Sequence, residues 1–169
     1  SASGPVRSSV RFPDVEAVSL GGRRHRLPAE FPAELTLAVV AFQQWHQARV
    51  DRWIARAVDA GIPGTPRGHT LPLPTAVVEL PVLSTRWRPA RRFIDGGMAT
   101  SIRNPDILSR TLTIYTDVGR FHSALTIPDS ADVHVFVVDR TGSVLARAHG
   151  EPDERAWQQL ARTLGVVGQ

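Results

Sequence analysis

The sequence predicts an α/β protein, a three-layer sandwich around a mixed β-sheet with an additional β-hairpin at its N-terminal end. Two observations favour this class. Strand-like apolar segments alternate with segments of helical spacing through much of the chain, as in sheets joined by crossover helices. A second hairpin pattern and a final helix follow, and a hairpin adds antiparallel strands to such a sheet. We expect one domain at 11–165 and a flexible lead-in at 1–10.

The first half of the chain contains a hairpin, a strand and a helix. Residues 15–27 are typical of a hairpin whose turn is Gly21-Gly22. The nearly continuous apolar run at 35–42 predicts a strand buried on both faces. Helical spacing covers 45–60, and the Pro- and Gly-rich stretch at 61–74 predicts a loop. One face of the expected helix carries the apolar residues Val50, Trp53, Ile54, Ala57 and Val58.

The second half supplies the rest of the sheet and its other helices. The expected elements are a strand at 75–83, a helix at 89–102, a strand at 111–115, a short helix at 118–125, strands at 133–138 and 144–148, and a helix at 152–164. Pro89 suits the first position of a helix. The sequence "DRTG" between the last two strands is a hairpin signal. Asp153 in the first turn and Gly165 after the last turn delimit the final helix.

Composition narrows the function classes. All 20 basic residues are arginine and the net charge is +4, which we interpret as codon bias rather than a sign of nucleic-acid binding. No apolar run reaches the ~18–20 residues of a membrane helix, and the first ten residues lack the apolar core of a signal peptide. The chain has no cysteine, so disulfides give no information on its compartment. We expect the cytoplasm by default, with an exported or membrane-peripheral location as the open alternatives.

Three stretches carry a family resemblance that spans 11–164. They are the entry hairpin "FPDVEAVSLGGRRHRL", the strand and helix "LTLAVVAFQQWHQARV", and the closing hairpin "VHVFVVDRTGSVLARAHG". Together they resemble the thioredoxin-fold superfamily of peroxiredoxin-like (AhpC/TSA-like) and thiol-oxidoreductase-like proteins. The resemblance implies a thioredoxin-like sandwich.

A narrower resemblance involves "LPVLSTRWRPARRFIDGGM" and "RTLTIYTDVGRFHSALTIPD". These stretches are similar to the thioredoxin-like assembly factors of the mitochondrial ATP synthase and their bacterial relatives. That resemblance implies a chaperone-like assembly role rather than a redox activity, with another protein as the partner.

The sequence departs from the thiol enzymes at their reactive positions. In the resemblance, "QWHQAR" lies over the usual Trp-Cys-x-x-Cys, so that His46 and Arg49 occupy the cysteine positions next to Trp45. Val133 stands where the relatives have a cis-proline, and we expect a trans bond there because a non-proline cis bond costs ~3–4 kcal/mol. These four positions predict a degenerate thiol site with no catalytic residue, no cofactor and no thiol-dependent oxidoreductase activity.

Histidine offers the main alternative chemistry. His46 near a helix start is a candidate base or metal ligand in an enzyme that reuses the cleft without thiols, although we favour a structural role for it. The six histidines lack the spacing of a strong metal site, so we predict no metal. His134 and His149 lie on the terminal hairpin and could approach each other. Whether the protein is an enzyme stays open, and we favour that it is not.

A basic cluster provides a third hypothesis. The sequence "RWRPARRF" places several cations near the expected helix start, where the helix dipole disfavours them. A solvated surface explains the cluster, and so does an anionic partner such as an acidic protein, phospholipid headgroups or, less favoured, a nucleic-acid backbone. The candidate partner-binding or anion-binding residues are Arg86, Trp87, Arg88, Arg91 and Arg92. Our main hypothesis remains a non-redox binding or assembly module.

Overall fold

The computed structural model of the protein describes residues 10–64, 70–85 and 110–166. These residues contain seven strands, three α-helices and a 3-10 turn. In chain order they are β1 (Val15–Ser19), β2 (Arg24–Leu27), β3 (Ala33–Ala41), the 3-10 turn η1 (Gln44–His46), α1 (Gln47–Asp59), β4 (Leu73–Ser84), β5 (Leu112–Thr116), α4 (Val118–Leu125), β6 (His134–Asp139), β7 (Val144–His149) and α5 (Glu154–Leu164).

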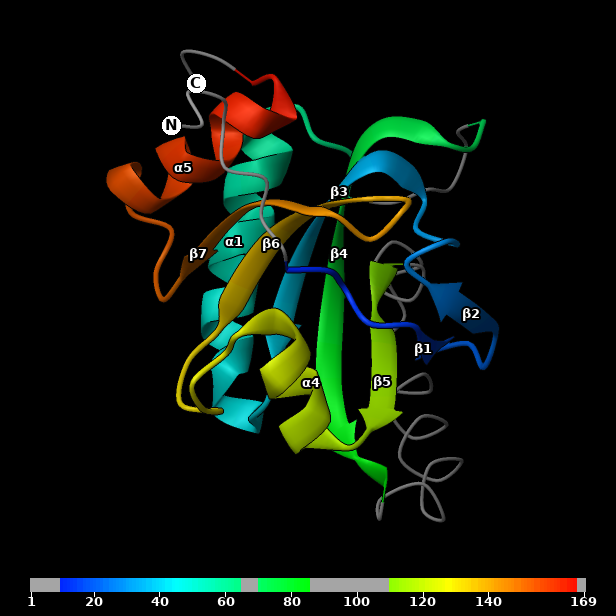
Figure 1. The fold of residues 1–169 in the computed structure, drawn as a ribbon. Coiled ribbons are helices and arrows are strands. Elements are labelled where there is room, and N and C mark those ends of the chain that lie inside the picture. The colour runs from blue at the N-terminus through cyan, green and yellow to red at the C-terminus, as the bar shows by residue number, and fades with distance from the viewer. Residues whose placement is uncertain (1–9, 65–69, 86–109, 167–169) are drawn as a thin grey trace, which may run out of the picture.

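The strands form one mixed sheet in the order β2-β1-β5-β4-β3-β6-β7 (Figure 1). The three central strands β5, β4 and β3 run parallel to one another. Hairpins flank them on both sides, because β1 is antiparallel to β5 and β6 is antiparallel to β3. The predicted mixed α/β sheet with an N-terminal hairpin is therefore confirmed.

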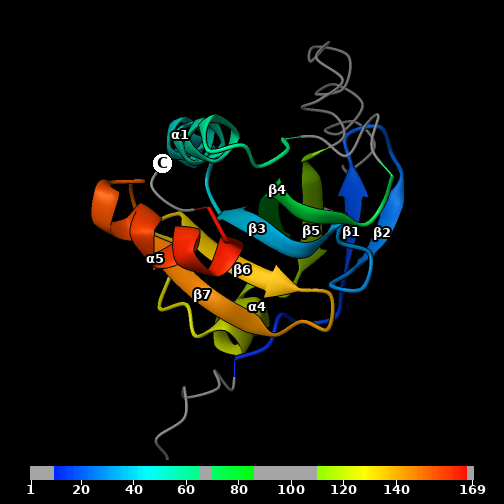
Figure 2. The same ribbon diagram turned by 90° about the horizontal axis from the view of Figure 1, so that it is seen from above.

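The helices lie on both faces of this sheet, with α1 and α5 on one face and α4 on the other (Figure 2). Strand β3 shows how the two cores are separated. Leu37 and Val39 belong to the core under α1 and α5, whereas Ala38 and Val40 belong to the core under α4. All four side chains are fully buried, as expected for a strand covered on both faces. The three-layer thioredoxin-like sandwich is confirmed.

The apolar stripe of α1 is narrower than expected. Val50, Trp53, Ile54 and Ala57 are buried, but Val58, which we expected on the same face, is 45% exposed. Each residue advances the helix by about 100°, so Val58 lies beyond the buried arc. The helix also begins at Gln47, because the preceding three residues form the 3-10 turn.

The final helix follows its expected signals closely. The side chain of Asp153 accepts a hydrogen bond from the Ala156 N–H at 2.8 Å, which caps the first turn. Gly165 ends the helix in the left-handed conformation, with φ of 78°. The expected lead-in at 1–10, apart from Val10, the expected helix at 89–102 and the cluster Arg86, Trp87, Arg88, Arg91 and Arg92 lie outside the described residues.

Candidate functional site

The turn between β3 and α1 carries the first two candidate residues. Trp45 and His46 lie in the 3-10 turn, and their ring centroids are 4.3 Å apart. Their environments differ completely, because His46 is fully buried whereas Trp45 is 54% exposed. The turn therefore buries one ring and presents its neighbour to solvent.

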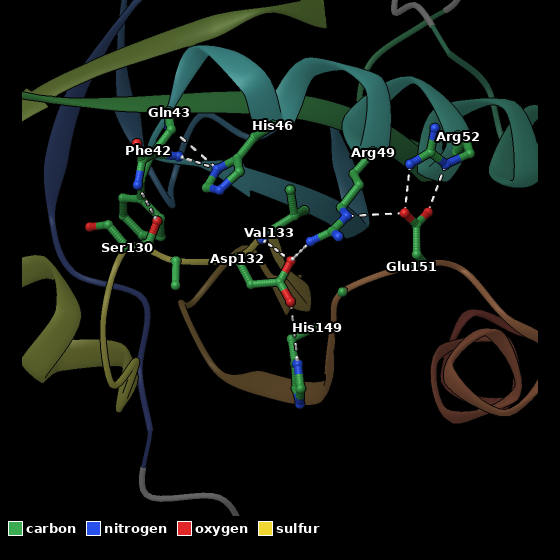
Figure 3. Close-up of polar contacts among 12 residues, drawn as sticks. Phe42, Gln43, His46, Arg49, Arg52, Ser130, Asp132, Val133, His149 and Glu151 are labelled. Carbon is green, nitrogen blue, oxygen red and sulfur yellow. Dashed lines mark hydrogen bonds and ion pairs between the residues drawn. The ribbon is translucent and has the colours of Figure 1, made fainter.

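The buried imidazole of His46 is bound to its own backbone turn (Figure 3). Its Nδ1 accepts hydrogen bonds from the N–H groups of Phe42 at 3.1 Å and Gln43 at 3.3 Å. An accepting ring nitrogen carries no proton, so the proton of the neutral ring lies on Nε2. The ring thus caps the turn that leads into α1.

Burial also sets the charge state of His46. Loss of solvent lowers the pKa of the imidazole below its usual value, and the nearby Arg49 cation acts in the same direction. The backbone carbonyl of Ala131 and the carboxylate of Asp132 act in the opposite direction but do not outweigh burial. The ring is therefore neutral at pH 7, and its one unprotonated nitrogen already accepts two hydrogen bonds.

Arg49 joins α1 to the loops on either side of the closing hairpin. Its Nη1 donates to Asp132 Oδ1 at 2.7 Å and its Nε donates to Glu151 Oε2 at 3.0 Å (Figure 3). The guanidinium carbon lies 5.2 Å from the centroid of the Trp45 ring, within cation–π range. Two acidic residues and one aromatic ring therefore fix the orientation of this side chain.

Arg52, one turn further along α1, reinforces the same connection. Its Nε and Nη2 each donate to a different oxygen of Glu151, both at 2.6 Å. This is the bidentate geometry that makes arginine–carboxylate pairs strong. The hydrogen bonds from Arg52 and then from Arg49 lower the pKa of the Glu151 carboxyl, so this residue stays ionised at pH 7.

Val133 completes the set of four positions. It is fully buried, its N–H donates to Asp132 Oδ1 at 2.8 Å, and its carbonyl accepts from the Gly150 N–H at 3.0 Å. The cis peptide bonds among the described residues precede Pro28 and Pro72, so the bond before Val133 is trans.

The structure thus brings the four candidate positions together. We call Trp45, His46, Arg49 and Val133 the thiol-position cluster. No thiol exists there, the lone pair of the histidine is engaged, and the guanidinium is paired. The arrangement therefore offers neither a nucleophile nor a general base.

Sequence reasoning did not identify the acidic partners Asp132 and Glu151. A usable signal was present, because Arg49, Arg52 and Arg56 recur along one side of the predicted helix and need counter-charges. Asp132 precedes Val133 directly, and Glu151 follows the closing hairpin. The sequence could not show that both loops lie beside the same helix.

A second candidate site lies next to the cluster, on the terminal hairpin. We call this hollow of about 650 Å³ the hairpin pocket, and its lining residues are Thr126, Pro128, Asp129, Asp132, His134, Arg147, Ala148, His149 and Gln159. Burial, then the neighbouring His149 and Arg147, lowers the pKa of His134 to about 4. Within the described ranges, no three histidine or acidic side chains are grouped as a metal site.

The remaining candidate residues cannot be placed. The basic cluster at 86–92 lies outside the described residues, so its role stays a prediction. In the part of the chain that the structure describes, no helix is both long and apolar enough to cross a membrane.

Comparison with known proteins identifies the class by fold. No family model matches the sequence, and no curated protein is significantly similar to it. Among solved structures, the exposed lipoprotein thioredoxin Etrx1 of Streptococcus pneumoniae is similar, with a TM-score of 0.55 and 12% identity over 90% of this chain and 98% of that one.

Two further structures extend the comparison. BsSco, a member of the Sco family of cytochrome c oxidase assembly proteins, has a TM-score of 0.57 at 10% identity, covering 96% of this chain and 94% of its own. A thiol:disulfide interchange protein DsbE from Chlorobium tepidum has a TM-score of 0.51 at 15% identity, with 92% and 96% covered. At such identities the likeness shows the fold alone. The chain is a cysteine-less protein of thioredoxin-like fold.

Proposed function

We propose that this protein is a non-redox binding module that contacts another protein and serves in assembly as a chaperone-like helper. The main support is the contrast, within the thiol-position cluster, between side chains that are bound inside the chain and one that is exposed. His46 and Arg49 are held by contacts inside the chain, whereas Trp45 beside them stays 54% exposed. An exposed tryptophan backed by a fixed guanidinium is typical of an interface, where Trp and Arg are enriched among the residues that dominate binding.

The resemblance to the ATP synthase assembly factors supports the assembly role. So does the fold neighbour BsSco, whose name places it among the assembly proteins of another respiratory complex. Both supports rest on shared fold and on short stretches of sequence. The partner is therefore proposed as a protein subunit of a larger complex, without a more specific identity.

The redox activities of thioredoxin-fold enzymes are not part of this proposal. Disulfide exchange and thiol-dependent peroxide reduction both need a thiolate, and the chain has no cysteine. We expect the purified protein to show no turnover in insulin-reduction and peroxide assays, with a thioredoxin as the positive control. Turnover that follows the protein through successive purification steps would contradict this expectation.

An enzyme that uses His46 is the first alternative, and the geometry disfavours it. A general base needs a free lone pair within reach of the substrate. The Nδ1 of His46 accepts from two backbone N–H groups, and the side chain has no exposed surface. We therefore rank this alternative below the binding module.

Binding of an anionic surface through the basic cluster at 86–92 is the second alternative. Such contacts weaken as salt rises, because exposed charges are screened. We expect the triple change Arg86→Gln, Arg88→Gln and Arg92→Gln to reduce binding to anionic liposomes. Unchanged binding would remove this alternative. The cytoplasmic location also stays a prediction, which fractionation of the native cell tests.

The experiment for the main proposal places a photo-crosslinking amino acid at Trp45 in the native cell. The matched control carries the same amino acid at Leu71, which is also exposed, at 55%, but lies before β4 and away from the cluster. We expect a discrete protein adduct from position 45 that is absent from position 71. The proposal fails if position 45 gives no adduct, or if both positions give the same adducts.

A further inference from the structure

The hairpin pocket contains two histidines that face each other across the strands β6 and β7. His134 and His149 are direct partners in the antiparallel register. The hydrogen bond from the Gly150 N–H to the Val133 carbonyl lies just outside this pair, which marks it as a non-hydrogen-bonded pair. Side chains approach each other most closely at such positions. The two ring centroids are 5.7 Å apart and the ring planes differ by 31°.

This separation matches two imidazoles that share one metal ion. Zinc–nitrogen distances are about 2.0–2.1 Å, which puts the centroids of two rings on one tetrahedral ion about 5 Å apart and on a linear arrangement about 6 Å apart. The 5.7 Å observed for His134 and His149 lies inside that range. The side chain of His149 is 73% exposed, so its ring has room to rotate toward an ion shared with His134.

A carboxylate lies beside the pair. Asp132 Oδ2 is 4.0 Å from His149 Nδ1, while Asp132 Oδ1 is held by Arg49 (Figure 3). One oxygen of Asp132 is thus fixed by Arg49, and the other faces His149. A carboxylate next to a histidine is a common ligand or orienting group in metal sites.

Arg147, which also lines the pocket, is held by two backbone carbonyls and an aromatic ring. Arg147 Nη1 donates to the Leu125 carbonyl at 2.8 Å and its Nη2 donates to the Thr126 carbonyl at 3.3 Å. Its guanidinium carbon also lies 4.9 Å from the centroid of the Phe136 ring. These contacts hold the charge of Arg147 against backbone oxygens and an aromatic ring.

We propose that His134 and His149 bind one divalent transition-metal ion of the zinc, nickel and copper class, with Asp132 Oδ2 and water as the further ligands. Imidazole is a preferred ligand of these ions. Among the described residues, no three histidine or acidic side chains are already grouped around one point. In the proposed site the two histidines therefore bind the ion first, and Asp132 Oδ2 moves in as the third protein ligand. This site is independent of the protein-binding role proposed above.

The test uses the full chain without an affinity tag, stripped of metal with a chelator and then dialysed. Isothermal titration with zinc chloride and with nickel chloride should give one site per chain, with a Kd on the order of micromolar. His149→Gln should weaken binding at least about tenfold, because loss of a supporting group alone costs metal sites about 10–100-fold. The fold should be kept, since His149 is largely exposed.

The matched control is His25→Gln, on β2 at the opposite edge of the sheet. This variant should bind as tightly as the unmodified chain. Binding that His149→Gln leaves unchanged, or no binding at concentrations below about 100 µM, would overturn the proposal.

Broadening of NMR signals by nickel gives a second readout, which does not depend on a measured affinity. Nickel is paramagnetic, so it should broaden the ring resonances of His134 and His149 at substoichiometric amounts while those of His25 stay sharp. Equal broadening of all three rings would mean that the ion binds non-specifically, and the proposal would fall.

Discussion

Asp132 belongs to both sites, with Arg49 of the thiol-position cluster bound to one of its oxygens and His149 of the hairpin pocket near the other (Figure 3). The histidines of the two sites differ in burial and in hydrogen bonding. In the cluster, the Nδ1 of His46 accepts two backbone hydrogen bonds and the ring has no exposed surface. In the pocket, the side chain of His149 is 73% exposed, its Nδ1 lies 4.0 Å from the second oxygen of Asp132, and its ring centroid lies 5.7 Å from that of His134.

This difference shows that the place of a site in the fold does not decide which of its side chains are able to react or to bind a ligand. In the sequence resemblance the cluster lies over the reactive positions of thiol enzymes, yet its side chains hold α1 against the loops at 132 and 151. The pocket keeps two imidazoles close together beside a carboxylate. Available lone pairs, rather than location in the fold, decide what each region can bind.

The largest expected effect comes from removing the His46 side chain. His46→Ala should lower the free energy of unfolding by about 2–4 kcal/mol, because two backbone N–H groups lose their acceptor and a fully buried ring is removed. Urea denaturation of the variant and of the unmodified chain measures this change.

The matched variant His46→Asn separates the hydrogen bonds from the packing. The Oδ1 of asparagine can take the place of Nδ1 as acceptor, so this variant should recover part of the loss. If alanine and asparagine destabilise the protein equally, the backbone hydrogen bonds to His46 contribute nothing measurable.

The next prediction restores thiols to the cluster. His46→Cys with Arg49→Cys should form an intramolecular disulfide under mild oxidant, because residues i and i+3 at the start of a helix share one face. The reduced form should be less stable than the unmodified chain, since the cap and the ion pairs to Asp132 and Glu151 are lost. Oxidoreductase activity should stay poor until Val133→Pro is added.

Mass spectrometry after oxidation measures the loss of two hydrogens. A double variant that stays fully reduced would mean that the comparison with thiol enzymes is wrong at this site, and so would a separation of the two Cα atoms above ~7 Å.

A third prediction concerns acid stability and the pocket. The pKa of His134 is lowered from 6.5 to about 4 in the folded protein, so between these values the unfolded chain binds more protons. Stability from this group is complete above pH 6.5 and is lost as the pH falls toward 4. In metal-free buffer, His134→Gln should reduce the slope of unfolding free energy against pH across this window. An unchanged slope would mean that the pKa of His134 is not lowered in the folded protein.

The smallest expected effect comes from the exposed ion pair of Arg52 with Glu151. Exposed pairs contribute little, so Arg52→Gln should shift Tm by about 2 °C or less, and added salt should remove the difference. A markedly larger shift that persists in high salt would show that the cluster depends on this pair more than on the backbone cap of His46.

Much of the fold could be predicted from local signals. The run at 35–42 became a central strand, the final helix begins at its Asp153 cap, and the closing hairpin forms where "DRTG" indicates it. Such features depend on neighbours in sequence. The 3-10 turn at Gln44–His46 was missed because nothing in its composition distinguishes it from a first helical turn.

The site was less predictable because its contacts are long-range. Arg49 pairs with residues 83 and 102 positions away, and no spacing in the sequence reveals such partners. The approach of His134 and His149 was foreseen, because a hairpin turn fixes the register of its two strands. The carboxylate that lies beside them was not.

The central claim is that His46 is a structural cap of the turn before α1. Multidimensional NMR of the imidazole nitrogens of His46, followed through an acid titration, tests it most directly. We predict the proton on Nε2, an unprotonated Nδ1, and a pKa below that of exposed histidines, because burial disfavours the charged ring. A proton on Nδ1, or titration near the usual value of about 6.5, would contradict the account and return His46 to consideration as a reactive group.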